Sequence, residues 1–288
     1  MEMSDAARAV AAAMSVAASL GLPVGDAVVL HNSNKLAVRL TPCDVFARIA
    51  HAGQEVARFE VELAGRLAEG GWPVCPLEPR ADPRVYVRDG FAVTLWTYYE
   101  PAARHVPPAD YAKALERLHA GMREVDVAGP RFTDRIAYAE GIVADPERSP
   151  ELADADRVFL GGRLAGLRRA IEDRGAAEQL LHGEPHPGNV LSTDNGPLFI
   201  DFETCCRGPV EFDLAHVPEA VRERYPGLDQ GLLDECRELV LAMVAAWRWD
   251  RGDRFPNGRR FGEALLLALR DGPPWPTLDT LNERLNGR

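Results

Sequence analysis

The first hundred residues alternate between short apolar runs and polar turns, a pattern typical of β-strands. Five runs fit this pattern: residues 27–30, 36–40, 45–50, 85–87 and 91–96. Residues 54–69 differ, because their apolar side chains recur every three or four positions and so predict a helix that ends at Gly70 and Gly71. An amphipathic helix is also expected over residues 4–20. This part of the chain is therefore predicted to be mostly β, with an inserted helix.

Helical periodicity dominates beyond Pro101. Four segments show it: residues 111–122, 156–174, 232–247 and 260–269. A β-hairpin at residues 190–200 interrupts them. The change near residues 96–101 predicts a hinge between two lobes. We expect an α+β fold with a mostly β amino-terminal lobe of residues 1–97 and a larger, mostly helical carboxy-terminal lobe of residues 98–288.

Composition restricts the possible partners. The formal net charge of -11 argues against nucleic acid, whose binding requires a basic surface. No apolar run is long enough to span a bilayer, so no membrane partner is expected. The five cysteines form no C-x-x-C pair, which indicates a reducing compartment and a cytoplasmic protein. An acidic surface suits a cationic or neutral small molecule, although the same bias is ordinary in cytosolic proteins.

Residues 182–203 concentrate the candidate chemistry. Residues 193–197 are a strong turn signal between two short apolar runs, so a hairpin is expected. A hairpin centred on Asn195 places Asn189 opposite Asp201, with Cβ atoms about 5 Å apart. An amide oxygen and a carboxylate that converge in this way suit Mg²⁺. This inference assumes the register, and a slip of one residue would separate the pair.

Glu184 supplies a second carboxylate five residues before Asn189, in a loop too rich in glycine and proline to be helical. Phosphoryl transfer requires metal ions that neutralise charge, in-line positioning, and a carboxylate that accepts the hydroxyl proton. The three side chains therefore favour transfer of a phosphoryl group from a nucleotide to an alcohol.

The order of these residues resembles the catalytic and metal-binding loops of aminoglycoside phosphotransferases and choline kinases, which are small-molecule kinases with a protein-kinase-like fold. The motif reads His182-x-Glu184-x4-Asn189, followed after a hairpin by Ile200-Asp201-Phe202. Two further segments are similar to that family: residues 208–215, with a Gly-x4-Asp-Leu-Ala pattern, and residues 115–120.

The resemblance implies roles by position. Asn189 and Asp201 would hold Mg²⁺, and Glu184 would occupy the position of the catalytic base. Asp213 would brace the catalytic loop through hydrogen bonds, and His182 would hold the same loop. ATP or GTP would be the co-substrate. The residues expected near the nucleotide are Arg48 at the phosphate-binding position, its helix partner Glu60, the turn residues Ser33 and Asn34, and Trp96, Thr97 and Tyr98 at the hinge.

This sequence departs from the family pattern at three places. Glu184 stands where the family has aspartate, and the extra methylene shifts the carboxylate by more than an ångström unless the loop compensates. Arg48 stands where the family has lysine, which keeps the charge but changes the geometry. The turn at residues 32–34 also lacks a glycine-rich signature.

Other residues admit plainer interpretations. A zinc site at His182 and His186 is excluded, because metalloprotease ligands at that spacing sit on one helix and the intervening prolines forbid one. Trp247 and Trp249 are interpreted as core or as a stacking surface for a substrate. Two acids nearby, Asp250 and Asp253, would attract a cationic substrate or simply end a solvated helix.

The sequence thus predicts a cytosolic phosphotransferase, a monomer or homodimer, that acts on a hydroxylated small molecule. By family analogy the acceptor is an antibiotic of the aminoglycoside kind. Two alternatives stay open. One is a metabolic kinase for an amino alcohol or a sugar, and the other is a pseudokinase that binds nucleotide without turnover because Glu184 replaces aspartate.

Overall fold

The chain divides into two compact units, each built from two stretches of sequence. The computed structural model describes residues 1, 3–33, 35–53, 55–100, 102 and 105–285. Unit 1 comprises Met1–Val127 and Gly188–Thr204, and unit 2 comprises Ala128–Pro187 and Cys205–Arg288. Within the described ranges, no helix is both long and apolar enough to cross a membrane.

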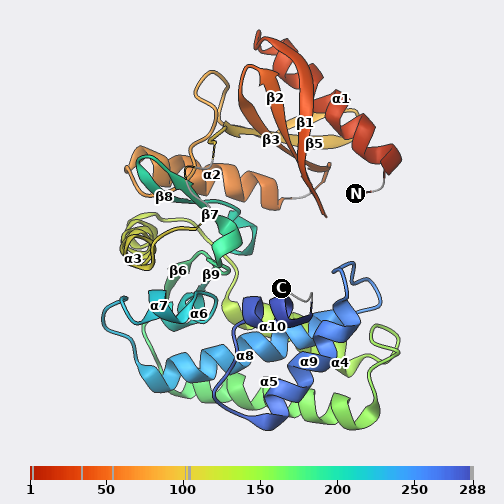
Figure 1. Ribbon diagram of the computed structural model, residues 1–288, viewed down its shortest axis with the longest axis vertical. Coiled ribbons are helices and arrows are strands. Elements are labelled where there is room, and N and C mark those ends of the chain that lie inside the picture. Colours follow the sequence, from red (N-terminus) through yellow and green to blue (C-terminus); the bar gives the residue numbers. More distant parts are fainter. Residues whose placement is uncertain (2, 34, 54, 101, 103–104, 286–288) are drawn as a thin grey trace. The chain divides into compact units, whose positions relative to one another are not determined.

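Unit 1 is built on a five-stranded antiparallel sheet with the strand order β1-β2-β3-β5-β4 (Figure 1). Its strands are β1 (Val24–Asn32), β2 (Leu36–Pro42), β3 (Val45–His51), β4 (Tyr86–Arg88) and β5 (Phe91–Thr97). These strands confirm the five apolar runs of the sequence to within a few residues. The antiparallel sheet and the helical unit 2 agree with the predicted α+β class.

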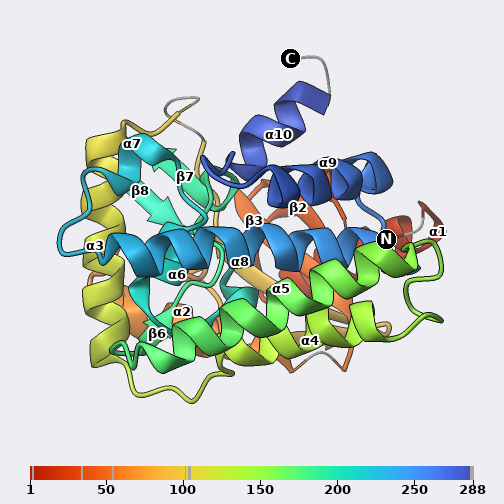
Figure 2. The same ribbon diagram turned by 90° about the horizontal axis from the view of Figure 1, so that it is seen from below.

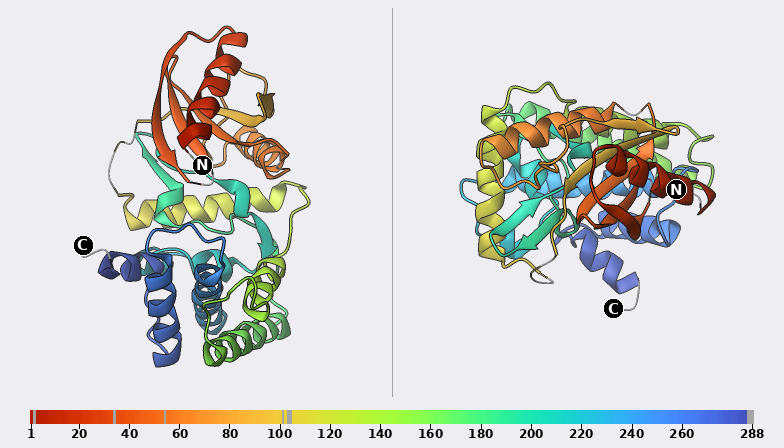
Figure 3. Two further views of the ribbon diagram at one scale, coloured as in Figure 1. Left: turned by 90° about the vertical axis from the view of Figure 1, so that its right-hand side faces the viewer. Right: turned by 90° about the horizontal axis from the view of Figure 1, so that it is seen from above.

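Side-chain alternation gives the sheet two different faces. Helix α1 (Met3–Ser19) packs its buried alanine and valine side chains on one face, against Leu36, Val38 and Leu40 of β2 and their neighbours (Figure 3). Successive strand residues point to opposite faces. Arg48 in β3, which pairs with Ala37 of β2, therefore lies on the face away from α1. The hydrophobic pattern thus leaves one face of the sheet for polar chemistry.

The 190–200 hairpin belongs to unit 1. Strands β7 (Val190–Thr193) and β8 (Gly196–Phe199) form it, and Phe199 exchanges backbone hydrogen bonds with Pro73 and Cys75 at 2.9 Å each. The Phe199 ring also lies 5.9 Å from that of Tyr111, on helix α3 (Pro108–Glu124). Because of this packing, unit 1 includes α3 and the hairpin and does not end at the expected break between residues 97 and 98.

The register of this hairpin differs from the predicted one by a single residue. Thr193 pairs with Gly196, which has φ +104°, so the turn consists of two residues and its centre lies before Asn195. Asn189 consequently pairs with Ile200, whose N–H donates to the Asn189 carbonyl at 3.0 Å, and not with Asp201. The expectation that Asn189 and Asp201 face each other directly was wrong, although both lie at the same end of the hairpin.

Unit 2 is mainly helical. Its helices are α4 (Phe132–Ala144), α5 (Asp154–Asp173), α6 (Val210–Leu214), α7 (Glu219–Arg222), α8 (Gln230–Trp249), α9 (Gly258–Asp271) and α10 (Leu278–Leu285). Helices α4, α5, α8 and α9 lie side by side around one apolar core (Figure 2). Strands β6 (Gln179–Leu181) and β9 (Cys206–Gly208) form a two-stranded antiparallel sheet. In the sequence, β6 comes before and β9 comes after the stretch Gly188–Thr204, which belongs to unit 1. The predicted helices correspond to α3, α5, α8 and α9, whereas α4 was not predicted.

Candidate active site

Three elements of unit 1 bring together a cluster of charged side chains. Arg48 projects from β3, Glu60 from helix α2 (Val56–Glu69), and Asp201 follows β8. Arg48 Nη1 donates to Glu60 Oε1 at 2.6 Å, and Arg48 Nη2 donates to Asp201 Oδ1 at 2.8 Å. The ion pair that the resemblance implied between Arg48 and Glu60 is thus present, and it includes the candidate metal ligand Asp201.

Lys35 adds a second cation to this cluster. Its Nζ donates to Glu60 Oε2 at 3.1 Å and forms an ion pair with Glu203, and the residue is only 8% exposed. Sequence reasoning assigned no role to Lys35 or Glu203. A signal existed for both. Lys35 precedes Ala37 by two positions and so falls on the same sheet face as Arg48, while Glu203 follows Asp201 by two residues.

The chemistry of this cluster suits a divalent cation. Oxygen atoms of Glu60, Asp201 and Glu203 lie within 4.8 Å of one another. Glu60 is already engaged, because it accepts from Arg48, from Lys35 and from the Phe202 N–H at 3.1 Å. Asp201 and Glu203 are therefore the better candidates for a hard-oxygen site. Three carboxylates against two cations also leave the cluster net negative.

Arg48 stays charged in this setting. Burial acts to lower the pKa of its guanidinium, but Glu60 and Asp201 outweigh burial and raise the pKa above its ordinary value. Asp201 itself has φ +67°, a left-handed conformation that non-glycine residues seldom adopt. Such backbone strain concentrates at functional sites, where the surrounding structure holds it in place.

The remaining residues expected near the nucleotide lie at or just after the carboxyl ends of β5 and β1. Trp96 is buried, and its indole N–H donates to Thr94 at 2.9 Å. The backbone N–H of Thr97 donates to the Pro76 carbonyl at 3.0 Å, so it serves the fold of unit 1. Tyr98 donates its hydroxyl to Glu100 at 3.1 Å. Ser33 lies in the turn between β1 and β2, whereas Asn34 lies outside the described residues.

In unit 2, Asp213 organises the loop that carries Glu184. The buried Asp213 carboxylate accepts from the backbone N–H groups of His182, at 2.9 Å, and Gly183, at 2.8 Å. His182 is fully buried, and its Nδ1 lies 3.4 Å from the Glu184 N–H, which donates to it. Gly183 adopts φ +89°, which a glycine tolerates. Asp213 and His182 thus lie where a bracing role requires them.

Glu184 forms an ion pair that sequence reasoning did not predict. Its carboxylate accepts from Arg135 on α4, and Arg135 also donates to the Gly183 carbonyl at 2.9 Å. Burial acts to raise the pKa of Glu184, but the Arg135 guanidinium outweighs burial and lowers the pKa below its ordinary value. The carboxylate is therefore ionised at neutral pH. No sequence signal marked Arg135, because α4 itself was not predicted.

Comparisons with known proteins identify the fold and the family of this chain. No curated protein matches the chain. An amicoumacin kinase structure with AMP-PNP, Ca²⁺ and amicoumacin is 12% identical over 97% of this chain and 100% of that one, with a TM-score of 0.69. A choline/ethanolamine kinase family protein from Mesorhizobium loti is 19% identical over 94% and 96% of the two chains, with a TM-score of 0.66.

A third structure, of an aminoglycoside 2′-phosphotransferase with GDP, is 14% identical over 90% of this chain and 96% of that one, with a TM-score of 0.66. At such low identities these likenesses establish the protein-kinase-like fold, as the sequence predicted. The model of the phosphotransferase enzyme family matches residues 27–254, which include both the charged cluster of unit 1 and the Glu184 loop. The chain therefore belongs to the phosphotransferase enzyme family.

Proposed function

We propose that this protein transfers the terminal phosphoryl group of ATP or GTP to a hydroxyl group of a small molecule with the help of Mg²⁺. The observation that carries the proposal is the partly buried cluster of Lys35, Arg48, Glu60, Asp201 and Glu203. Its net negative charge attracts a divalent cation, and its two cations match the negative oxygens of a nucleotide triphosphate.

Each residue has a proposed task in this reaction. Asn189 and Asp201 hold the Mg²⁺ ion, which neutralises phosphate charge when bound. Arg48 anchors a phosphate while Glu60 fixes its position, and Glu184 accepts the hydroxyl proton. Asp213 keeps the Glu184 loop in place through its two backbone hydrogen bonds. The nucleotide is further contacted at the turn of Ser33 and Asn34 and at residues 96–98.

The proposed role is antibiotic modification of the kind carried out by aminoglycoside kinases. Two of the similar structures are antibiotic kinases with amicoumacin and spectinomycin bound. A metabolic kinase for an amino alcohol is the second candidate, favoured by the likeness to choline and ethanolamine kinases. None of the five cysteines forms a disulfide in the described residues, which fits a cytoplasmic protein. We propose a monomer or a homodimer.

A phosphoryl-transfer screen tests the proposal. Purified protein is incubated with Mg²⁺, ATP or GTP, and a panel of antibiotics, amino alcohols and sugars, and acceptor-dependent nucleotide consumption is measured. Asp201→Asn should abolish turnover while the fold stays intact. Asp194→Asn makes the same change at the exposed tip of the same hairpin and should leave turnover unchanged. Nucleotide-dependent thermal stabilisation without transfer to any acceptor would indicate the pseudokinase instead.

A further inference from the structure

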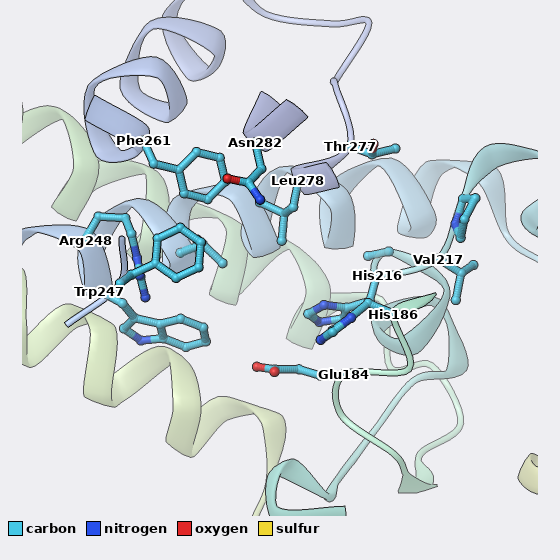
Figure 4. A pocket seen from close by; sticks show the side chains of 14 residues that line it. Glu184, His186, His216, Val217, Trp247, Arg248, Phe261, Thr277, Leu278 and Asn282 are labelled. Atoms are coloured by element: carbon cyan, nitrogen blue, oxygen red, sulfur yellow. The ribbon is translucent and has the colours of Figure 1, made fainter. Parts of the chain in front are cut away.

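Unit 2 contains a cavity beside Glu184 that none of the roles above has used. Its volume is about 320 Å³, within the range of small-molecule sites. Helix α8 contributes Trp247 and Arg248, α9 contributes Phe261, and α10 contributes Leu278 and Asn282 (Figure 4). His186 and His216 line the same cavity, and the Glu184 carboxylate extends from their side toward Trp247.

The described acids around this cavity are already neutralised. Glu184 is paired with Arg135, and Asp253 lies 3.1 Å from Arg248 Nη1. Asp250, the other acid considered as an attractor of cations, is paired with Arg148 at 2.9 Å. Burial lowers the pKa of His216 to about 4, so this imidazole is uncharged at neutral pH. A cationic ligand would therefore find no unpaired carboxylate among these side chains.

Arginines of the protein already lie over two of the aromatic rings of the cavity. The Arg248 guanidinium lies 4.5 Å from the centroid of the Phe255 ring, and the Arg135 guanidinium lies 5.4 Å from that of Trp247. Both rings line the cavity. Electron-rich ring faces are what proteins use to hold quaternary ammonium groups, and here the protein's own arginines already interact with them. An amine or choline-like head group would compete with both.

Two polar groups of the wall are donors without an acceptor. Arg248 Nε and the Trp247 indole N–H are buried and form no hydrogen bond in the part of the chain that the structure describes, and neither does His216 Nε2, which in a neutral imidazole can be the donor or the acceptor. Burial also lowers the pKa of Arg248 from its ordinary value, a sign of incomplete compensation of its charge. Hydroxyl and carbonyl oxygens would satisfy such donors, whereas an ammonium group would not.

We propose that this cavity binds the phosphoryl acceptor and selects an uncharged, ring-containing alcohol over an amine. The inference rests on the proposed phosphoryl transfer, and it replaces the aminoglycoside-like antibiotic and the amino alcohol considered above by an uncharged acceptor. An ammonium group that enters the cavity would lose its hydration without gaining a carboxylate, which is unfavourable. A ring with hydroxyl or carbonyl oxygens would instead fill the space against Trp247, Phe255 and Phe261 and accept from Arg248.

A matched pair of probes tests the selection by charge alone. 2-Phenylethanol and 2-phenylethylamine share one ring and differ in a hydroxyl against an ammonium group at neutral pH. Binding to the full chain without nucleotide is followed by NMR, with the Trp247 indole N–H signal as the marker of the cavity. We expect the alcohol to bind at least about fivefold more tightly. Equal or tighter binding of the amine, or no shift of the Trp247 signal with either probe, would overturn the proposal.

Substitutions of Arg248 and of Phe255, with one control variant, test which side chains cause the selectivity. Arg248→Met should free the Asp253 carboxylate and shrink or invert the preference for the alcohol. Arg174→Met removes an arginine from its pair with Glu235, neither of which lines the cavity, and should leave the preference unchanged. Phe255→Ala is a second test that does not threaten folding, because Phe255 is 40% exposed. It should weaken binding of the alcohol several-fold, and an unchanged affinity would contradict the assignment.

Binding of the probes and phosphoryl transfer can be measured independently of each other. Probe binding requires no nucleotide, so it can be measured even if no phosphoryl transfer is found. Asp201→Asn in unit 1 should abolish transfer yet leave the probe preference as in the parent protein. Conversely, a phosphoryl-transfer screen in which kanamycin is turned over faster than every uncharged ring alcohol would refute the acceptor class while supporting the kinase.

Discussion

Glu60 is a single side chain on which two cations of the candidate active site depend. Its Oε1 accepts from Arg48 and its Oε2 from Lys35, and the residue is 3% exposed. Loss of one partner from a buried ion pair leaves charge without compensation. Glu60 is therefore a residue at which the stability of unit 1 and the proposed nucleotide binding can be tested together.

Glu60→Gln should lower the free energy of unfolding by about 3 kcal/mol and raise the KM for the nucleotide at least tenfold. Urea denaturation and steady-state kinetics would measure the two effects. Glu62→Gln is the matched control, because Glu62 is on the same helix but pairs with Arg66 at the exposed surface. It should change stability by no more than about 0.5 kcal/mol. Equal effects of the two variants would mean that the cluster has no special role.

Arg135 determines the charge state of Glu184, and this should be visible in pH dependence. The lowered pKa of Glu184 means that the pair stabilises the fold above the ordinary carboxyl pKa, and this stabilisation is lost as the pH falls through the lowered value. In Arg135→Met burial acts without opposition from Arg135 and should raise the pKa of Glu184. At neutral pH the Glu184 carboxylate of this variant would still be ionised, and its uncompensated charge would lower the free energy of unfolding.

The free energy of unfolding of Arg135→Met should therefore fall below that of the parent by about 2 kcal/mol at pH 7, less than for a fully buried pair. The difference should shrink as the pH approaches 4. Arg168→Met, which removes a more exposed arginine that pairs with Glu140, should show no such trend. Denaturation curves across pH would decide, and a constant difference would show that Arg135 acts through packing alone.

The sequence predicted individual residues only where a motif or a strand pattern marked them. Arg48, Glu60 and Asp201 came from the resemblance, and the structure brings them into one cluster. Lys35 was visible in principle, since strand alternation places it on the face of Arg48. Arg135 could not be found in this way, because its partnership with Glu184 depends on how α4 packs.

Among the elements, strands were easier to predict than hairpin register. Alternation defines a strand over several residues, whereas register depends on the length of the turn. The two-residue turn that ends at Gly196 shifted Asn189 to pair with Ile200. Helix α4 escaped prediction because its small residues, alanine and glycine, weaken the contrast between apolar and polar faces.

Helix α3 offers a test of packing at this scale. A Cβ at Gly121 would lie 2.7 Å from Cδ1 of Trp72 and closer still to two other ring atoms, so only glycine fits here. Gly121→Ala should destabilise the fold by about 1–3 kcal/mol. Gly162→Ala on α5, where a Cβ meets nothing within 4 Å, should stabilise it by about 0.5–1 kcal/mol. Urea denaturation would measure both, and effects of the same sign would refute this packing argument.

For the whole molecule, net charge is a poor guide to the ligand. The formal charge of -11 suited a cationic substrate, yet the described acids near the cavity of unit 2 are paired with arginines. A net charge governs long-range attraction, whereas binding depends on which charges remain unpaired at the site. The sequence gives the net charge, but it does not show which charges at the site are unpaired, because pairing depends on how the chain folds.

The two units should also differ in their unfolding. One described cluster of buried side chains lies wholly in unit 1 and another wholly in unit 2, and chains with separate cores often depart from two-state behaviour. Calorimetry should therefore resolve two transitions.

Gly121→Ala should lower only the transition temperature of unit 1, and Gly162→Ala should raise only that of unit 2. Mg²⁺ with nucleotide should raise the first, and 2-phenylethanol the second, since each ligand stabilises the unit that binds it. A single transition that all four changes shift would mean that the units fold as one, and the nucleotide and acceptor sites would then be thermodynamically coupled.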